Sequence, residues 1–115
     1  MPTMPSLYRQ GDVLLQAVDT IPDAARPVAR DGGRIILAYG ESTGHAHAIE
    51  APEAEATLLS VSENERFLLL VADVDLAHEE HATIRLPAGI YRVVRQRVWT
   101  DAAADAEENW RYAGD

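Results

Sequence analysis

The sequence predicts an all-β protein, a small single-domain barrel or sandwich of about seven short strands. Two observations lead to this class. Apolar runs of strand length alternate along the chain with turn signals made of Gly, Pro, Asn and Asp. No stretch shows a convincing long helical pattern. The 115 residues suit a single core, so residues 1–115 are expected to form one domain.

The strands expected in the first half of the chain lead into the segment His45-Ala46-His47. The first strand is expected to begin near Gly11, because Gln10-Gly11-Asp12 is a turn signal. Residues 20–27 contain two prolines and are expected to be a loop. The strands of this half are residues 13–18, residues 34–39, the His45-Ala46-His47 segment and residues 57–61.

Residues 66–77 are expected to form one long strand that orients the second half of the chain. Its core face carries the alternating residues Leu68, Leu70, Ala72, Val74 and Leu76. His78 continues this face, and Glu79-Glu80 forms a turn. The return strand covers residues 82–86, Pro87-Ala88-Gly89 forms a turn, and the last strand covers residues 90–99. Strict alternation places His81 away from the apolar residues of the return strand, so it reaches the core side only if a bulge resets the phase.

Both ends of the chain are expected to be peripheral. Residues 1–7 are expected to be a flexible lead, and residues 100–115 a tail in which Trp110-Arg111-Tyr112 alternates like a small docking strand.

Composition excludes several classes of function. The net charge is -9 and all basic residues are arginine, which disfavours nucleic acid and anionic membranes as partners. The chain has no cysteine, so a metal must be held by nitrogen and oxygen. No apolar run reaches the roughly 18 residues of a membrane span, and the first residues lack a signal-peptide pattern. We expect a cytoplasmic protein.

All four histidines lie in two short segments, which predicts a metal site. His45 and His47 are separated by one small residue, so a strand presents both imidazoles on one face. His78 and His81 flank the Glu79-Glu80 turn. We expect His45, His47 and His78 to bind one divalent ion, with His81, Glu80 or Glu50 completing or supporting the shell.

The ligand types suit zinc, iron, nickel, copper or manganese. Three protein ligands with a vacant position can acidify water or bind a substrate oxygen, whereas four close the site and make the metal structural. If the site is catalytic, Glu79 or Glu80 is the expected general base. A small anionic substrate would be oriented by the basic and aromatic side chains of the last strand, namely Tyr91, Arg92, Arg95 and Arg97.

Two stretches resemble the metal motifs of the cupin superfamily. Gly40, His45, His47 and Glu50 match the first motif, and residues 87–91 match the second, with Arg92 at the position of the cupin histidine. The chain is also similar to a set of small, uncharacterised bacterial proteins over a longer pattern. That pattern includes Gln-Gly-Asp-Val-Leu-Leu at residues 10–15 and His-Glu-Glu-His at residues 78–81, together with residues 38–47 and 86–97. The second resemblance implies no particular activity.

Two alternative functions remain open from the sequence. In the first, the histidine cluster is a structural metal site of an interaction or sensor module, or holds a homo-oligomer interface, and chelation lowers the melting temperature. In the second, paired histidines act as acid and base on a phosphodiester without a metal, with arginines on the phosphate.

Overall fold

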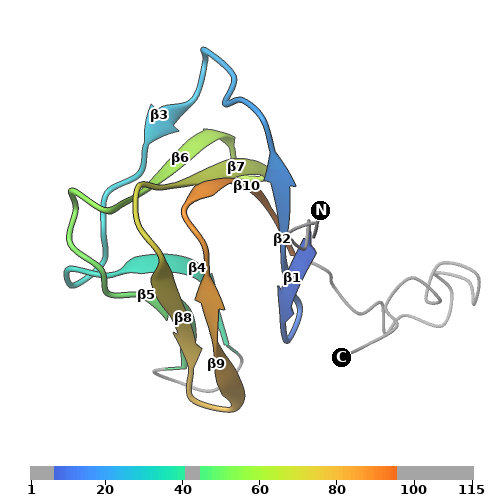
Figure 1. Cartoon of the computed structure of the whole chain (residues 1–115), viewed down its shortest axis with the longest axis vertical. Helices are drawn as coiled ribbons and strands as arrows, with labels where there is room; N and C mark the ends of the chain where they lie inside the picture. The colour runs from blue at the N-terminus through green and yellow to red at the C-terminus, as the bar shows by residue number, and fades with distance from the viewer. Residues whose placement is uncertain (1–6, 41–44, 96–115) are drawn as a thin grey trace, which may run out of the picture.

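The structure, a computed structural model, describes residues 7–40 and 45–95, and these residues form two antiparallel sheets that face each other (Figure 1). The larger sheet has the order β1-β2-β10-β7-β6-β3, and the smaller has the order β4-β5-β8-β9. The larger sheet contains β1 (Leu7–Gln10), β2 (Val13–Val18), β3 (Arg26–Pro27), β6 (Ala56–Ser62), β7 (Glu65–Leu70) and β10 (Gly89–Arg95). The smaller sheet contains β4 (Ile35–Tyr39), β5 (Ala46–Ile49), β8 (Val74–His78) and β9 (His81–Leu86). The all-β prediction is confirmed, and the arrangement is a sandwich rather than a closed barrel.

The first predicted strand corresponds to β2, but β1 precedes it and was missed. Residues 7–10 pair with residues 13–16 through a two-residue turn at Gly11 and Asp12. Gly11 has a φ of 59°, a conformation that glycine adopts without steric cost. The expected lead of residues 1–7 therefore ends in a strand at Leu7, and its other residues lie outside the described part of the chain.

The prediction of one long strand over residues 66–77 was wrong. The segment bends after Leu70, so that β7 lies in the larger sheet and β8 in the smaller (Figure 1). The predicted core face holds on both sides of the bend, because Leu68, Leu70, Val74 and Leu76 are all buried. Both sheets turn this face toward one shared core, and alternation continues across the bend.

Side chains from both sheets fill that core. The most deeply buried are Val13, Leu15, Leu37, Ile49, Leu68, Leu76 and Leu86. Burying each such side chain contributes roughly 1.5–3 kcal/mol. The short strand β3 lies within the expected loop of residues 20–27 and pairs with β6 at the edge of the larger sheet.

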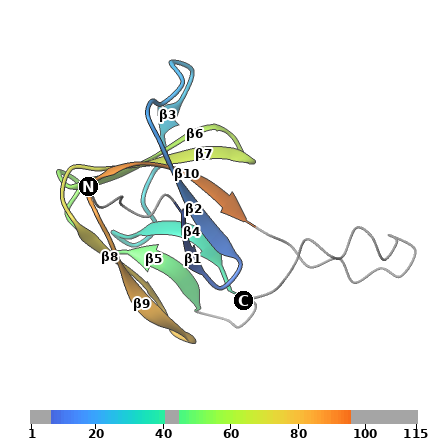
Figure 2. The same cartoon turned by 45° about the vertical axis from the view of Figure 1, so that its right-hand side comes forward.

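Side-chain hydrogen bonds connect the two sheets. Gln10 in β1 donates from Nε2 to the carbonyls of Leu76 and Ala82, both at 2.9 Å. Two arginines of the larger sheet also bond to β4 of the smaller sheet. Arg66 donates to the Leu37 carbonyl, and Arg95 donates to the Tyr39 carbonyl. Figure 2 shows β6 and β7 of the larger sheet above β4 and β5 of the smaller sheet.

The last predicted strand and the predicted tail lie partly or wholly outside the described residues. Only residues up to Arg95 of the predicted last strand are described, and they form β10. The expected tail of residues 100–115, including Trp110-Arg111-Tyr112, lies outside the described residues. Within residues 7–40 and 45–95, no helix is long and apolar enough to cross a membrane.

Candidate functional site

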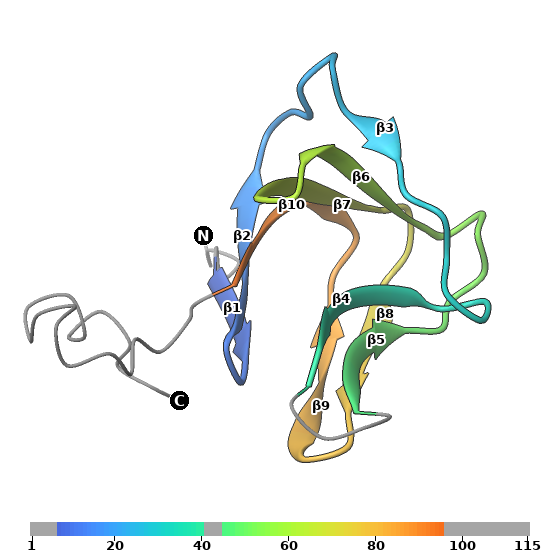
Figure 3. The same ribbon diagram turned by 180° about the vertical axis from the view of Figure 1, so that it is seen from behind.

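The four histidines come together at one end of the molecule. His45 directly precedes β5, His47 lies in β5, His78 ends β8 and His81 begins β9. The ring centres of His47 and His78 are 4.2 Å apart, those of His78 and His81 are 4.8 Å apart, and those of His47 and His81 are 5.9 Å apart. The ring of His45 lies 6.0 Å from that of His78. Figure 3 shows the β8–β9 hairpin and the β1–β2 turn at this same end.

A bulge brings His81 to the cluster. Leu76 pairs with Ile84, but His78 pairs with His81, so β9 uses one residue more than β8 over this interval. This shift reverses the alternation of β9 and places the His81 ring beside His78. The predicted turn at Glu79-Glu80 connects the two paired histidines.

Gln10 determines which nitrogen of His47 carries the proton. Its Nε2 donates to two carbonyls, so its Oε1 is the acceptor that faces His47 Nδ1 at 2.9 Å. The neutral His47 ring therefore carries its proton on Nδ1 and has a lone pair on Nε2. Both side chains are buried, with 3% exposure each, so this arrangement is rigidly held.

The lone pair of His47 Nε2 faces an acceptor. Asp12 Oδ1 lies 3.4 Å from His47 Nε2, and the second carboxylate oxygen of Asp12 accepts a hydrogen bond from Arg95 Nε at 2.9 Å. Burial, followed by the nearby His78, lowers the pKa of His47 to about 4. At neutral pH two lone-pair atoms therefore face each other with no proton between them.

His78 and His45 both lie beside Glu80 of the Glu79-Glu80 turn. His78 Nδ1 accepts a hydrogen bond from the backbone N–H of Glu80 at 2.9 Å, so neutral His78 carries its proton on Nε2. His45 Nδ1 is buried and makes no hydrogen bond, although Glu80 Oε2 lies 3.3 Å away. The distance is short enough for an ion pair but the angle is poor for a hydrogen bond.

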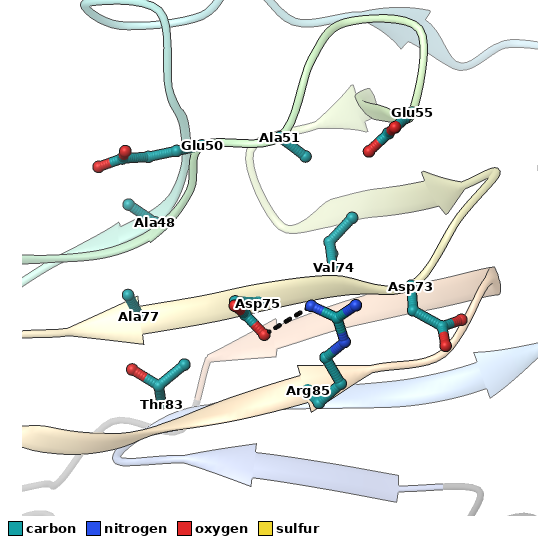
Figure 4. A pocket seen from close by; sticks show the side chains of 10 residues that line it. All are labelled: Ala48, Glu50, Ala51, Glu55, Asp73, Val74, Asp75, Ala77, Thr83 and Arg85. Atoms are coloured by element: carbon teal, nitrogen blue, oxygen red, sulfur yellow. Dashed lines mark hydrogen bonds and ion pairs between the residues drawn. The ribbon is translucent and has the colours of Figure 1, made fainter.

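The predicted glutamates have different surroundings. Glu79 accepts a hydrogen bond from the backbone N–H of Ala46 at 3.0 Å, and this bond is the main cause of its lowered pKa. The carboxylate therefore ties the β8–β9 hairpin to β5. Glu80 is 60% exposed beside His45. Glu50 lies on the opposite side of β5 from His47, where it lines a groove on the outer face (Figure 4).

That outer groove is separate from the histidine cluster. Its volume is about 570 Å³, its floor contains small residues such as Ala48 and Ala77, and its walls are mainly acidic. Arg85 donates to Asp75 at 3.0 Å across it (Figure 4). No histidine lines the groove.

Of the four side chains predicted to orient an anion, the structure places Arg95 at the cluster. Tyr91 is buried in the core, where its hydroxyl donates to the Pro87 carbonyl. Arg92 is exposed on the opposite face of β10 from Tyr91. Arg97 lies outside the described residues.

Sequence reasoning missed Gln10 and Asp12 as parts of the site. Both lie beside the β1–β2 turn, more than 30 residues before His45. The Gln-Gly-Asp segment at residues 10–12 was the available signal, but it was interpreted as a turn and as part of a resemblance, not as part of the site. Among residues 7–40 and 45–95, no group of three or more His, Asp or Glu side chains is already arranged to hold a metal ion.

Comparison with known families gives one match. Residues 9–96 match the family model described as "Domain of unknown function (DUF8820)". No curated protein and no solved structure matches the chain.

Proposed function

We propose for this chain, which belongs to the DUF8820 family of domains of unknown function, a role as a metal-binding domain. The ion is a divalent transition metal held at the histidine cluster by His47 Nε2, Asp12 and His81. His45 completes or supports this shell. His78 joins it only when its proton moves from Nε2 to Nδ1, which breaks the hydrogen bond from the Glu80 N–H. These nitrogen and oxygen ligands suit zinc, iron, nickel, copper or manganese.

The pair of facing acceptors at His47 and Asp12 carries the proposal. Two ligand atoms bound to one ion at about 2.1 Å lie roughly 3.0–3.4 Å apart, the separation expected for angles of a tetrahedral or octahedral shell. The separation of 3.4 Å between His47 Nε2 and Asp12 Oδ1 fits this range. A cation between the two atoms would remove the repulsion of their lone pairs. A proton on His47 Nε2 would also do so, but burial disfavours the charged form of His47.

The ring positions are close to those of imidazoles that share one ion. Imidazoles bound to one ion have their centres roughly 4.5–5 Å apart, given a metal–nitrogen distance of about 2.1 Å. The His78–His81 pair lies within this range at 4.8 Å, and the His47–His78 pair is closer at 4.2 Å. The two proposed ligands His47 and His81 are 5.9 Å apart, so their rings must approach each other when one ion binds both. Because no complete shell is preformed among the described residues, binding requires small rotations of Asp12 and His81, which their exposure to solvent permits.

The exposure of Asp12 and His81 favours an open site over a closed structural one. The Asp12 side chain is 37% exposed, and His81 lies on the surface at the hairpin. A bound ion with a vacant position supplies a Lewis acid and an acidified water molecule. We therefore propose chemistry on a small anionic substrate, with exposed Glu80 as the candidate base.

Metal titration of the chelator-treated protein tests this function. Isothermal titration calorimetry with Zn²⁺ and Mn²⁺ should give affinities that fall by about 100-fold or more in His47→Ala and Asp12→Asn, since each loses a ligand. Asp75→Asn is the matched control, because Asp75 lies in the outer groove with Arg85. Unchanged affinity in both folded site variants would refute the proposal.

A metal-free acid–base function is the second candidate. Neutral His47 presents a lone pair on Nε2, His78 presents an N–H on Nε2, and their ring centres are 4.2 Å apart. Hydrolysis of a simple phosphodiester that persists in excess chelator and is lost in His78→Ala would favour this candidate over the metal site.

A further inference from the structure

Two arginine side chains of the larger sheet, Arg66 and Arg95, point toward β4. Arg66 Nη2 donates to the Leu37 carbonyl at 2.7 Å, and Arg95 Nη2 donates to the Tyr39 carbonyl at 3.1 Å. Leu37 and Tyr39 are two residues apart in β4, so the two guanidinium groups are anchored to neighbouring parts of one strand. Arg95 also contacts Asp12, which places Arg95 beside the proposed metal site.

The Arg66 side chain lies on the core side of β7 and is only partly exposed. It shares its face of the strand with Leu68 and Leu70, which are buried. A half-buried guanidinium is normally paired with a carboxylate. Among the ion pairs of residues 7–40 and 45–95, none includes Arg66.

Among residues 7–40 and 45–95, the ion pairs leave an excess of positive charge at these two side chains. Asp12 is the carboxylate partner of Arg95, and the same Asp12 also faces His47. Burial is the main cause of the lowered pKa of Arg66, and the nearby charge of Arg95 lowers it further. An anion bound between the two arginines would offset the excess of positive charge.

The donors of the two arginines are also underused. A guanidinium has five N–H donors in a planar fork, which matches the oxygens of a carboxylate or a phosphate. Within the described part of the chain, Arg66 uses one of these in its bond to Leu37, and Arg95 uses two groups, Nε and Nη2. Several N–H groups therefore remain for a ligand.

We propose that Arg66 and Arg95 form a binding site for the oxyanion of a small molecule, a carboxylate or a phosphate, held beside Asp12 and His47. This inference rests on the proposed function, since the anion would be the charged group of the substrate that reaches the metal. Arg66 is the new member of the site, and it brings a rigid fork from the core side of β7.

Titration of the chelator-treated protein with inorganic phosphate and, separately, with acetate tests the site without a metal ion. Two-dimensional NMR should show shifts at β4, β7 and β10, and the stronger of the two probes identifies the preferred oxyanion. Arg66→Gln and Arg95→Gln should each weaken that probe by about tenfold or more, because a charge-assisted hydrogen bond is lost. Arg85→Gln, on the outer face, is the matched control and should change the affinity by less than about twofold.

Arg66→Lys guards against a folding artefact, because it keeps the charge but loses the fork. We expect it to melt near the wild-type temperature and to bind the preferred probe less tightly than wild type but more tightly than Arg66→Gln. Equal phosphate and acetate affinities in wild type, Arg66→Lys and Arg66→Gln would overturn the inference. So would an effect of Arg85→Gln as large as that of Arg66→Gln, because binding would then follow net charge alone.

The test separates this site from the metal site. Arg66 is not a proposed metal ligand, so Arg66→Gln should leave Zn²⁺ affinity within about threefold of wild type. If phosphate or acetate binds through Arg66 while no variant affects metal affinity, the metal proposal fails and the anion site stands. If metal affinity depends on His47 but neither oxyanion binds, the anion site fails and the metal site stands.

Discussion

At the scale of single residues, His47 shows how a buried contact prepares a side chain for chemistry. Gln10 holds the Nδ1 proton, so the Nε2 lone pair has a defined direction. Burial lowers the pKa of the ring to about 4, so the ring stays neutral at pH values well below the ordinary pKa of histidine. The same burial makes the protein sensitive to acid, since a neutral ring in the folded state resists protonation that the unfolded chain accepts.

The metal-free protein should therefore lose stability as pH falls from about 6.5 toward 4. In this window the unfolded chain binds a proton at His47 while the folded protein does not, which lowers the free energy of unfolding by on the order of 2–3 kcal/mol. Above about pH 6.5 both states of His47 are neutral, so none of this stability is lost. Urea unfolding at pH 7 and pH 4.5 measures it, with His47→Asn as the comparison. Equal losses in both proteins would show that other groups cause the acid sensitivity.

At the scale of elements, the β1–β2 turn and the β8–β9 hairpin meet over a glycine. A Cβ atom at Gly11 would lie 2.7 Å from His81 Nε2 and 3.2 Å from His47 Cε1. Gly11 has a φ of 59°, and Gly32 has a similar φ of 63° with nothing within 4 Å of its Cβ position. The two glycines therefore separate backbone strain from crowding of the histidines.

Gly11→Ala and Gly32→Ala should each destabilise the protein by on the order of 1 kcal/mol, because both force alanine into a left-handed conformation. Only Gly11→Ala should also weaken metal binding, by about tenfold, since it displaces His81. Urea unfolding and metal titration of both variants provide the measurement. A similar loss of metal affinity in Gly32→Ala would contradict the proposed position of the site.

At the scale of the whole molecule, Gln10 connects the two sheets. The β1 and β9 strands do not share a hydrogen-bonded ladder, and the Gln10 amide instead satisfies carbonyls of β8 and β9. Its other end reaches His47 in β5. One buried side chain therefore contributes both to the contact between the sheets and to the orientation of the proposed metal ligand.

Gln10→Met should destabilise the protein by on the order of 2–4 kcal/mol, because it leaves buried carbonyls and His47 Nδ1 without their partner. Ser60→Ala is the control, since the Ser60 hydroxyl bonds to the Ser62 carbonyl at an exposed position. Thermal and urea unfolding measure both. A loss below about 0.5 kcal/mol in Gln10→Met would show that Gln10 does not join the sheets.

Several parts of the fold and the site were predictable because local patterns report them directly. Alternation identified the core face of residues 66–77, and the spacing of polar residues identified the Glu79-Glu80 turn. The bend at residues 71–73 was not predictable, because the same alternation serves two separate strands that share one core. The approach of Asp12 to His47 was equally hidden, since their pairing depends on how the two sheets face each other.

The sequence by itself determined the strand class, the inward leucine stripe and the restriction of all histidines to two short segments, since these depend on neighbours within a few residues. Tertiary structure alone decided that a bulge turns His81 toward the other histidines and that Gln10 orients His47. It also decided that Arg66 and Arg95 reach one strand from the opposite sheet. The physical reason is that register shifts and contacts between sheets are selected by packing of the whole core, which no local pattern in the chain records.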